Sequence, residues 1–326
     1  MRPHCIEFGG EMSVICSFRL LTKGGINMQW PCIITAMVTP FTEDGVLDEA
    51  RAESLAGWLV ANGSEGLVVA GTTGESPTLS RSERERLYYA VRRGAGNAMV
   101  LMGTGSNDTH HAVEMSQEAA RWGADGVLVV TPYYNKPPQE GLFQHFVKIA
   151  ENLSAPVMLY NVPGRTGVTL AADTVARIAK ACPNVVAVKE ATGQIESIER
   201  LLEICPGMMV YSGDDALFYP ALTLGAHGVV SVAAHVVGPE MAALVQAFRS
   251  GDITAARGLH GRLLPIFRDL FSWPNPIPLK WLMNQLNMNV GPVRLPLVYP
   301  QDTSTLERLK VNVEDLRREK IARHAS

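Results

Sequence analysis

The chain has little cysteine, and its cysteines are scattered. No two of them have the CxxC spacing, and none has the Cys/His spacing of a structural zinc site. An odd number of isolated thiols is typical of proteins from a reducing compartment. These residues therefore argue against structural zinc and favour a cytoplasmic location. They are Cys5, Cys16, Cys32, Cys182 and Cys205.

Long apolar runs and an excess of one charge are also missing. Every strand-like run is broken by Gly, Thr or a charged residue before it reaches the roughly 18 residues needed to cross a bilayer. The net charge is −3, and the basic residues are dispersed except in a mixed segment near the C-terminus. We therefore expect no nucleic-acid or membrane partner, and we expect local groups to capture small anionic substrates.

Residues 1–27 lack the features of a targeting peptide. They have neither the apolar core of a signal peptide nor the amphipathic, Arg-rich pattern of a transit peptide. Periodic patterning begins only at Trp30, and Lys23-Gly24-Gly25 is what a purine-rich ribosome-binding site would encode. We expect Met28 to be the biological start and residues 1–27 to be a non-native or disordered extension.

Two nucleotide-binding signatures are absent. No GxGxxG turn follows the first apolar run, and the Gly-rich turn at 71–76 is not followed by the Lys-Ser/Thr of a P-loop. The chain instead alternates β-branched runs with helical patterns. Strands are expected at 32–38, 66–71, 98–103, 126–131, 156–160, 185–189, 209–212 and 228–232, and helices at 47–62, 80–94, 109–122, 140–152, 170–181, 194–204, 215–225 and 238–249.

Such alternation requires parallel strands joined by right-handed crossovers. Its extent predicts an α/β fold of the (β/α)8 TIM-barrel class over residues 28–250. Residues 251–326 are expected to form a C-terminal helical region, with an ordered Pro-rich loop at 273–278 before a helix at 279–287. Catalytic groups of a barrel lie at the carboxyl ends of its strands, so one pocket should collect the polar residues found there.

Lys189 carries the most information about chemistry. It follows the β-branched run Val185–Val188, which has the composition of a buried strand. Lysine is rarely buried without a role or a partner, and burial disfavours its charged form and leaves a nucleophilic amine. The other seven of the chain's eight lysines lie on amphipathic or Pro-rich segments. A lysine just beyond a strand end can equally reach water or pair with Glu190.

Other reactive side chains follow the neighbouring strands. The turn Gly71–Ser76 offers backbone N–H groups and two hydroxyls to an anion, although a tight turn with helix capping explains it equally well. Tyr133 and Tyr134 end one strand and Tyr160 ends the next, so their phenols can join a hydrogen-bonded proton relay or simply pack under loops. Arg165 lies in a Pro/Gly-restrained loop suited to carboxylate capture, or it is an ordinary surface arginine.

Five segments together resemble the dihydrodipicolinate synthase family, also called 4-hydroxy-tetrahydrodipicolinate synthases, within the N-acetylneuraminate lyase superfamily. The resemblance covers roughly residues 30–300, and the order of the segments is more specific than any one of them. The segments are Gly71–Ser76, Thr131–Pro137, Tyr160–Gly167, Val188–Gly193 and Ser212–Asp215.

The resemblance implies an enzyme that needs no metal and no organic cofactor. Pyruvate would form a Schiff base with Lys189, and the resulting enamine would attack L-aspartate-4-semialdehyde, in lysine and diaminopimelate biosynthesis. Tyr160 would be the acid/base and Thr72 its relay partner. Tyr134 would complete the relay in a neighbouring subunit, which implies at least a dimer, and we expect a homotetramer.

The resemblance also implies which residues bind the substrates. Thr73 would hold the pyruvate carboxylate and Arg165 the semialdehyde carboxylate. Gly213 and Val230 would line the pocket.

A regulatory cleft is implied as well, formed by Ser76, Arg81, Arg84, Asn107, His111 and Tyr133. Family members inhibited by lysine usually have histidine where this chain has Arg81, and glutamate where it has His111. The inhibitor's ammonium would lose a carboxylate and meet cations, so we expect weak or absent inhibition.

Three alternatives stay open at this point. Sibling enzymes share the barrel and the Schiff-base lysine but differ in the second substrate: N-acetylneuraminate lyase, 2-keto-3-deoxy-sugar-acid aldolases and 4-hydroxy-2-oxoglutarate aldolase. Arg165 and the Tyr133-Tyr134 pair favour a short carboxylated aldehyde. A non-catalytic barrel would form no adduct with pyruvate, and a metal-dependent hydrolase would lose activity with chelators.

Overall fold

The predicted barrel is present, which confirms the fold class. The computed structural model describes residues 30–325, with side chains to residue 318, so the extension expected at 1–27 and two of the cysteines lie outside the described residues. Eight parallel strands form one closed sheet in chain order, and β8 pairs back onto β1. The strands are β1 (Ile33–Ala36), β2 (Gly66–Val69), β3 (Met99–Gly103), β4 (Gly126–Val130), β5 (Val157–Asn161), β6 (Val185–Glu190), β7 (Met209–Ser212) and β8 (Gly228–Ser231).

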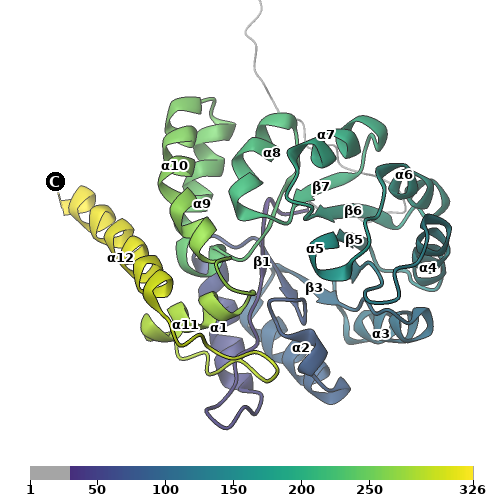
Figure 1. Ribbon diagram of the computed structural model, residues 1–326, viewed down its shortest axis with the longest axis horizontal. Helices are drawn as coiled ribbons and strands as arrows, with labels where there is room; N and C mark the ends of the chain where they lie inside the picture. Colours follow the sequence, from purple (N-terminus) through teal and green to yellow (C-terminus); the bar gives the residue numbers. More distant parts are fainter. Residues whose placement is uncertain (1–29, 326) are drawn as a thin grey trace, which may run out of the picture.

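Helices surround this sheet, as Figure 1 shows. Helix ends follow capping signals in the sequence: Asp48 accepts from the Arg51 N–H at 2.9 Å, and Ser80 with Glu83 forms a capping box. The helices beside the strands are α1 (Glu49–Ala61), α2 (Arg81–Ala95), α3 (Thr109–Trp122), α4 (Gln139–Glu151), α5 (Pro163–Thr166), α6 (Ala172–Ala181), α7 (Ile195–Ile204), α8 (Phe218–Leu224) and α9 (Ala234–Arg249), with short 3₁₀ turns η1 (Ser76–Thr78) and η2 (Asp215–Leu217).

Several boundaries differ from the sequence prediction. Residues 163–166 form one helical turn, α5, where a loop was expected. The helix expected at 238–249 begins at Ala234 and is kinked at Val237, just before Pro239. The helix expected at 279–287 is α11 (Ile277–Gln285), which begins earlier because proline is tolerated in a first helical turn.

The apolar core has two layers. One fills the space between the strands and the surrounding helices. The other fills the barrel itself, because residues at alternate positions of each strand point inward. Its members include Ile34, Val68, Leu101, Leu128, Met158, Tyr160, Ala187, Tyr211 and Val230.

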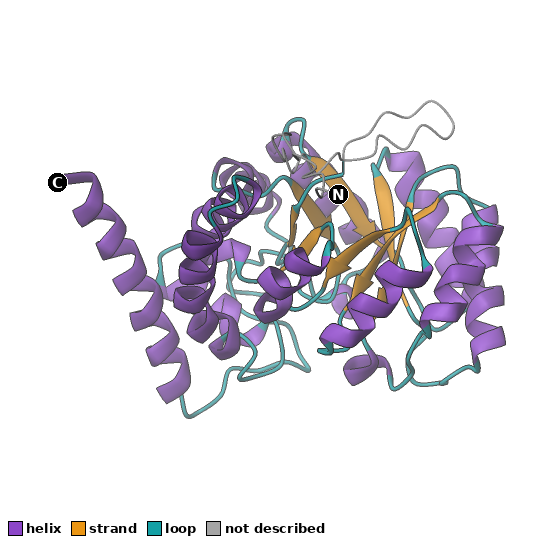
Figure 2. Cartoon of the chain, turned by 90° about the horizontal axis from the view of Figure 1, so that it is seen from above, coloured by secondary structure: helices purple, strands orange, loops and turns teal. Residues whose placement is uncertain are grey.

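The C-terminal region is helical, as expected. Helix α10 (Ile253–Asp269) packs on α9, and α12 (Ser304–Ala325) packs on α10 and α11. Figure 2 shows that α12 stands beside the barrel, next to α10 and away from the strands. An ion pair between Arg308 and Asp269, 2.7 Å apart, ties α12 to α10.

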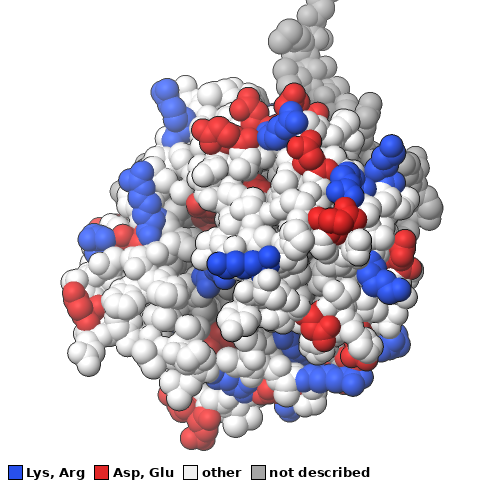
Figure 3. Space-filling model, turned by 45° about the vertical axis from the view of Figure 1, so that its right-hand side comes forward, with Lys and Arg blue, Asp and Glu red and all other residues white. Residues whose placement is uncertain are grey.

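The described residues contain no helix long and apolar enough to cross a membrane. On the face drawn in Figure 3, basic and acidic side chains are interspersed. Three cysteines of the described part of the chain, Cys32, Cys182 and Cys205, are buried free thiols.

Candidate active site

Lys189 lies near the carboxyl end of β6 and is 5% exposed. It is two residues from Ala187, which belongs to the barrel-interior layer, so the pleat directs both side chains inward. Within residues 30–318, no carboxylate lies at ion-pair distance from its amine. The local prediction of a buried lysine at this strand end is therefore correct, and pairing with Glu190 does not occur.

Two tyrosines flank Lys189 in the strand register. Tyr160 on β5 and Tyr211 on β7 are its partners in the neighbouring strands. The Lys189 amine lies 4.2 Å from the centroid of the Tyr160 ring. The Tyr211 hydroxyl instead donates to the Pro31 carbonyl oxygen at 2.8 Å, at the amino end of the barrel. Tyr160 is thus the strand phenol available to chemistry at the carboxyl rim.

A buried polar pair supports this register from the outer side of the sheet. Glu190 and Asn161 follow Lys189 and Tyr160 directly, and their side chains are buried among polar partners. The Asn161 amide donates to Glu190 at 2.9 Å, and the Thr192 N–H donates to the other carboxylate oxygen at 2.9 Å. Burial raises the pKa of Glu190. The pair thus joins β5 to β6 directly beside Tyr160 and Lys189, which face the barrel interior.

The turn at 71–76, which we call the active-site loop, follows β2. Thr73 is 2% exposed, and its hydroxyl accepts a hydrogen bond from the Asn275 amide at 2.8 Å. Arg165, exposed on α5, donates to the Asn275 backbone carbonyl at 3.4 Å. Asn275 therefore connects two predicted substrate-binding residues, and its Oδ1 is buried without a partner. Asn275 was not predicted as a site residue because it lies in the Pro-rich segment far along the chain.

Gly213 and Val230 lie beside the lysine. A Cβ at Gly213 would sit 2.6 Å from the Ala191 Cβ and 2.9 Å from the Lys189 Cε, so only glycine permits this approach. Val230 is 1% exposed and belongs to the same interior layer as Tyr160.

Tyr134 is exposed to solvent in its own chain. Its side chain is 89% exposed, and its φ of 74° places this non-glycine residue in the left-handed region. Within residues 30–318, no hydrogen bond joins Tyr160 to either Thr72 or Tyr134. One subunit alone therefore does not assemble the predicted relay.

The six residues of the predicted regulatory cleft are only partly brought together. Arg84 donates to the Ser76 carbonyl oxygen at 2.5 Å, and it is close enough to Tyr133 to interact electrostatically. Asn107 accepts through its backbone carbonyl from Asn135 at 2.9 Å.

The remaining two residues of that cleft, Arg81 and His111, are exposed. The Arg81 guanidinium forms an ion pair with Glu118 of α3. Part of its charge is therefore already compensated by a carboxylate of the same chain.

Asp215 is buried and hydrogen-bonded within its own chain. It is 1% exposed, and its carboxylate accepts from the Ser231 hydroxyl and from the N–H groups of Val232 and Ala233. Burial raises its pKa to about 6. Among the described residues, no cluster of three or more His, Cys, Asp or Glu side chains could hold a metal ion.

A second lysine of the described residues is also desolvated, although it lies on a helix and not at a strand end. Lys280 on α11 is 0% exposed and forms an ion pair with Glu75 of the active-site loop, with 2.9 Å between nitrogen and oxygen. Its position beside prolines was interpreted as part of a polar segment, although the neighbours Ile277, Leu279 and Leu282 are apolar and buried.

Comparisons with known proteins agree with the resemblance. A family model described as the dihydrodipicolinate synthetase family matches residues 30–316. A curated 4-hydroxy-tetrahydrodipicolinate synthase of a Cyanothece species is 50% identical, and the match covers 87% of this chain and 97% of the relative. The same enzyme of Desulforamulus reducens is 52% identical over 82% of this chain and 90% of its own length.

Solved structures agree as well. A dihydrodipicolinate synthase from Cyanidioschyzon merolae, crystallised with lysine bound, superposes with a TM-score of 0.84 at 44% identity, covering 87% of this chain and 98% of that one. The 4-hydroxy-tetrahydrodipicolinate synthase of Methylacidiphilum fumariolicum gives a TM-score of 0.86 at 41% identity, covering 90% and 98%.

Proposed function

The chain belongs to the dihydrodipicolinate synthetase family, and we propose that it condenses pyruvate with L-aspartate-4-semialdehyde to give 4-hydroxy-tetrahydrodipicolinate, in diaminopimelate and lysine biosynthesis. The observation that carries the proposal is the burial of Lys189 inside the barrel, with its amine against the Tyr160 ring. The names of the relatives favour this reaction over those of the sibling pyruvate-dependent aldolases and lyases.

The proposed chemistry is class I aldol addition. The neutral Lys189 amine attacks the keto carbon of pyruvate, and loss of water leaves an imine. Removal of a proton from the methyl carbon gives an enamine, whose carbon then attacks the aldehyde carbon. The amine of the second substrate displaces Lys189 by adding to the imine carbon, which closes the ring. One water is released overall, and no metal or organic cofactor is required.

Proton transfers fall to hydroxyl groups in this proposal. Tyr160 donates a proton to the departing hydroxide and later takes a proton back. Thr72 relays these protons. Tyr134 completes the relay in the site of a second subunit. Its 89% exposure supports this role, because a partner's surface would cover a phenol that its own chain leaves bare.

The oligomer is accordingly part of the proposal, with at least a dimer and a tetramer as the expected assembly. Sedimentation of the purified chain tests it directly. The free thiols Cys32, Cys182 and Cys205 support a cytoplasmic location.

Substrate binding is assigned to groups around the lysine. Thr73 grips the pyruvate carboxylate, and Arg165 meets the carboxylate of the semialdehyde at the entrance. Gly213 and Val230 shape the pocket. The link of both Thr73 and Arg165 to Asn275 supports placing the two carboxylates near each other.

Weak or absent inhibition by lysine is also proposed. Arg81 and His111 offer no carboxylate to an inhibitor ammonium, and the ion pair with Arg81 occupies the carboxylate of Glu118 on α3. Half-inhibition at submillimolar lysine in a rate assay would refute this.

The test of function is an assay with pyruvate and aspartate-4-semialdehyde, run beside N-acetylmannosamine and glyceraldehyde as rival acceptors. The proposal expects turnover with the semialdehyde alone. Comparable turnover with a sugar acceptor would transfer the assignment to a sibling aldolase.

A further inference from the structure

We propose that Glu75 and Lys280 are a positioning pair through which the C-terminal segment holds the active-site loop in the conformation that presents Thr72 and Thr73. This inference rests on the proposed function and adds to it two residues that do not touch substrate. It makes α11, which follows the barrel in the chain, part of the catalytic site.

The Lys280 ammonium uses all three of its donors. It donates to Glu75 Oε1 at 2.9 Å, to the Thr39 carbonyl oxygen at 3.0 Å and to the Pro292 carbonyl oxygen at 2.6 Å. It also lies 4.3 Å from the centroid of the Phe41 ring, where an ammonium is attracted by the ring's negative face. One nitrogen thus joins α11 to the loop after β2 and to Thr39, three residues beyond the end of β1.

Glu75 connects this contact to the catalytic threonines. Its N–H donates to the Thr72 carbonyl oxygen at 3.1 Å, which closes a turn over Thr72, Thr73 and Gly74. Its φ is 56°, in the left-handed region that a non-glycine residue enters only when surrounding contacts hold it there. The buried carboxylate supplies those contacts, since its second oxygen accepts from the Arg294 N–H at 2.7 Å.

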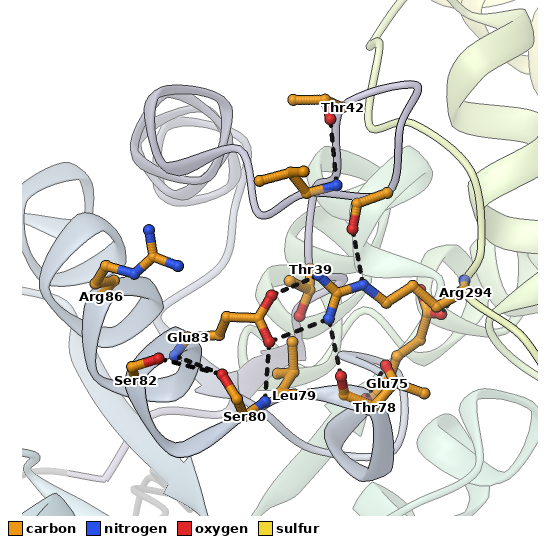
Figure 4. Close-up of polar contacts among 12 residues, drawn as sticks. Thr39, Thr42, Glu75, Thr78, Leu79, Ser80, Ser82, Glu83, Arg86 and Arg294 are labelled. Carbon is orange, nitrogen blue, oxygen red and sulfur yellow. Dashed lines mark hydrogen bonds and ion pairs between the residues drawn. The ribbon is translucent and has the colours of Figure 1, made fainter.

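Arg294 reinforces the same position from its side chain. Figure 4 shows its guanidinium between Glu83 and Thr78, next to Glu75. It donates to the Thr78 carbonyl oxygen at 2.8 Å and forms an ion pair with Glu83, the residue that also caps α2. The guanidinium holds the pKa of Glu83 down at about 2. Arg294 therefore also binds the residues that follow the loop, at Thr78 and Glu83.

The C-terminal segment also holds the active-site loop at a second position. Asn275, five residues before Lys280, donates to the Thr73 hydroxyl at 2.8 Å. One short piece of chain, residues 275–280, thus grips the loop at Thr73 and at Glu75. A shift of this piece would move both threonines together.

Stability alone gives a poor account of a charged pair at this place. Burial lowers the pKa of Lys280 to about 8 in spite of the attraction of Glu75. The folded state therefore disfavours the charged ammonium relative to the unfolded chain, and buried ion pairs are often no better for stability than apolar residues of similar size. What an apolar pair cannot reproduce is the set of directed hydrogen bonds.

The test compares Lys280→Met, Glu75→Gln and the double variant Glu75→Gln/Lys280→Met with the wild type. Kinetic constants for pyruvate, the thermal midpoint and borohydride trapping of pyruvate are measured on each folded protein. Lys280→Met should lower kcat/KM for pyruvate by about 10- to 100-fold, because small misplacements of catalytic groups have effects of this size. The double variant removes both buried charges, so its thermal midpoint should recover while kcat and KM stay impaired.

Arg308→Gln is the matched control. It removes the ion pair that ties α12 to α10, outside the loop, so it should lower the thermal midpoint and leave kcat and KM unchanged. The proposal is overturned if Lys280→Met keeps wild-type constants, or if the double variant recovers activity together with its midpoint. If Lys280→Met does not fold, Glu75→Gln and the double variant decide. A wild type that neither traps pyruvate nor condenses the substrates would contradict the proposed function instead.

Discussion

Two lysines are buried in the described part of the chain, and their surroundings are opposite. Lys280 directs its ammonium at a carboxylate and two carbonyl oxygens. Lys189 has no carboxylate within reach among the described residues, and its amine faces an aromatic ring. An ammonium whose three donors are all hydrogen-bonded is held in place as an anchor, whereas an amine with no carboxylate beside it is open to the carbonyl carbon of a substrate. Burial therefore does not by itself identify a nucleophile; the partners do.

Replacing Lys189 with Ala should have the largest effect on catalysis. Loss of the group that forms the covalent intermediate should lower kcat by about 10⁴-fold or more. The thermal midpoint should stay near that of the wild type, because no buried ion pair is broken. Steady-state kinetics and thermal unfolding measure both quantities. Substantial turnover by Lys189→Ala would contradict the different roles of the two lysines, since the chemistry would then require neither.

Tyr160→Phe should follow, because it keeps the ring against the amine and removes only the hydroxyl. Loss of a general acid/base lowers kcat by about 10²- to 10⁴-fold.

Tyr211→Phe is the control on the other side of Lys189. It removes a hydrogen bond to Pro31 worth about 1 kcal/mol and should leave kcat unchanged. Equal losses of kcat in the two variants would show that packing around the amine matters and the Tyr160 hydroxyl does not.

The anchoring role of Lys280 should be measurable as a change in the free energy of unfolding. Lys280→Met leaves the Glu75 carboxylate buried and unpaired, and breaking a buried pair in this way costs about 3–5 kcal/mol. Chemical denaturation measures the change in the free energy of unfolding. Lys189→Met, which breaks no pair, should cost far less. Equal destabilisation of the two methionine variants would contradict the anchoring role of Lys280.

The pH dependence of stability should give the smallest effect. Burial lowers the pKa of Lys280 from 10.5 to about 8, so between these values the unfolded chain binds the larger number of protons at this residue. The contribution of Lys280 to the free energy of unfolding should therefore rise with pH across that window, by at most about 1.4 kcal/mol per pH unit. Tyr299, which interacts electrostatically with Glu75, should keep its proton across this window, since burial raises the pKa of Tyr299 to about 12.

The measured quantity is the difference in unfolding free energy between the wild type and Lys280→Met, followed from neutral to alkaline pH. Titrations common to both proteins cancel in this difference. A difference that falls across the window would mean that the folded state stabilises the ammonium.

Much of the fold could be predicted from the sequence because it follows from local residue patterns. The strand period and the helical spacing predicted the eight units, and the run before Lys189 predicted its burial. Lys280 was missed because its partner Glu75 lies 205 residues away, and periodicity carries no information about such a contact. Asn275 was missed for the same reason. Tyr211 was not a sequence candidate, and the contact of its hydroxyl with the Pro31 carbonyl oxygen could be found only in the structure.

The most direct test of the account is borohydride reduction of the intact protein in the presence of pyruvate, followed by peptide mass spectrometry. The account predicts a pyruvate adduct on Lys189 and an unmodified Lys280. An adduct on Lys280, or no adduct on either lysine, would contradict it.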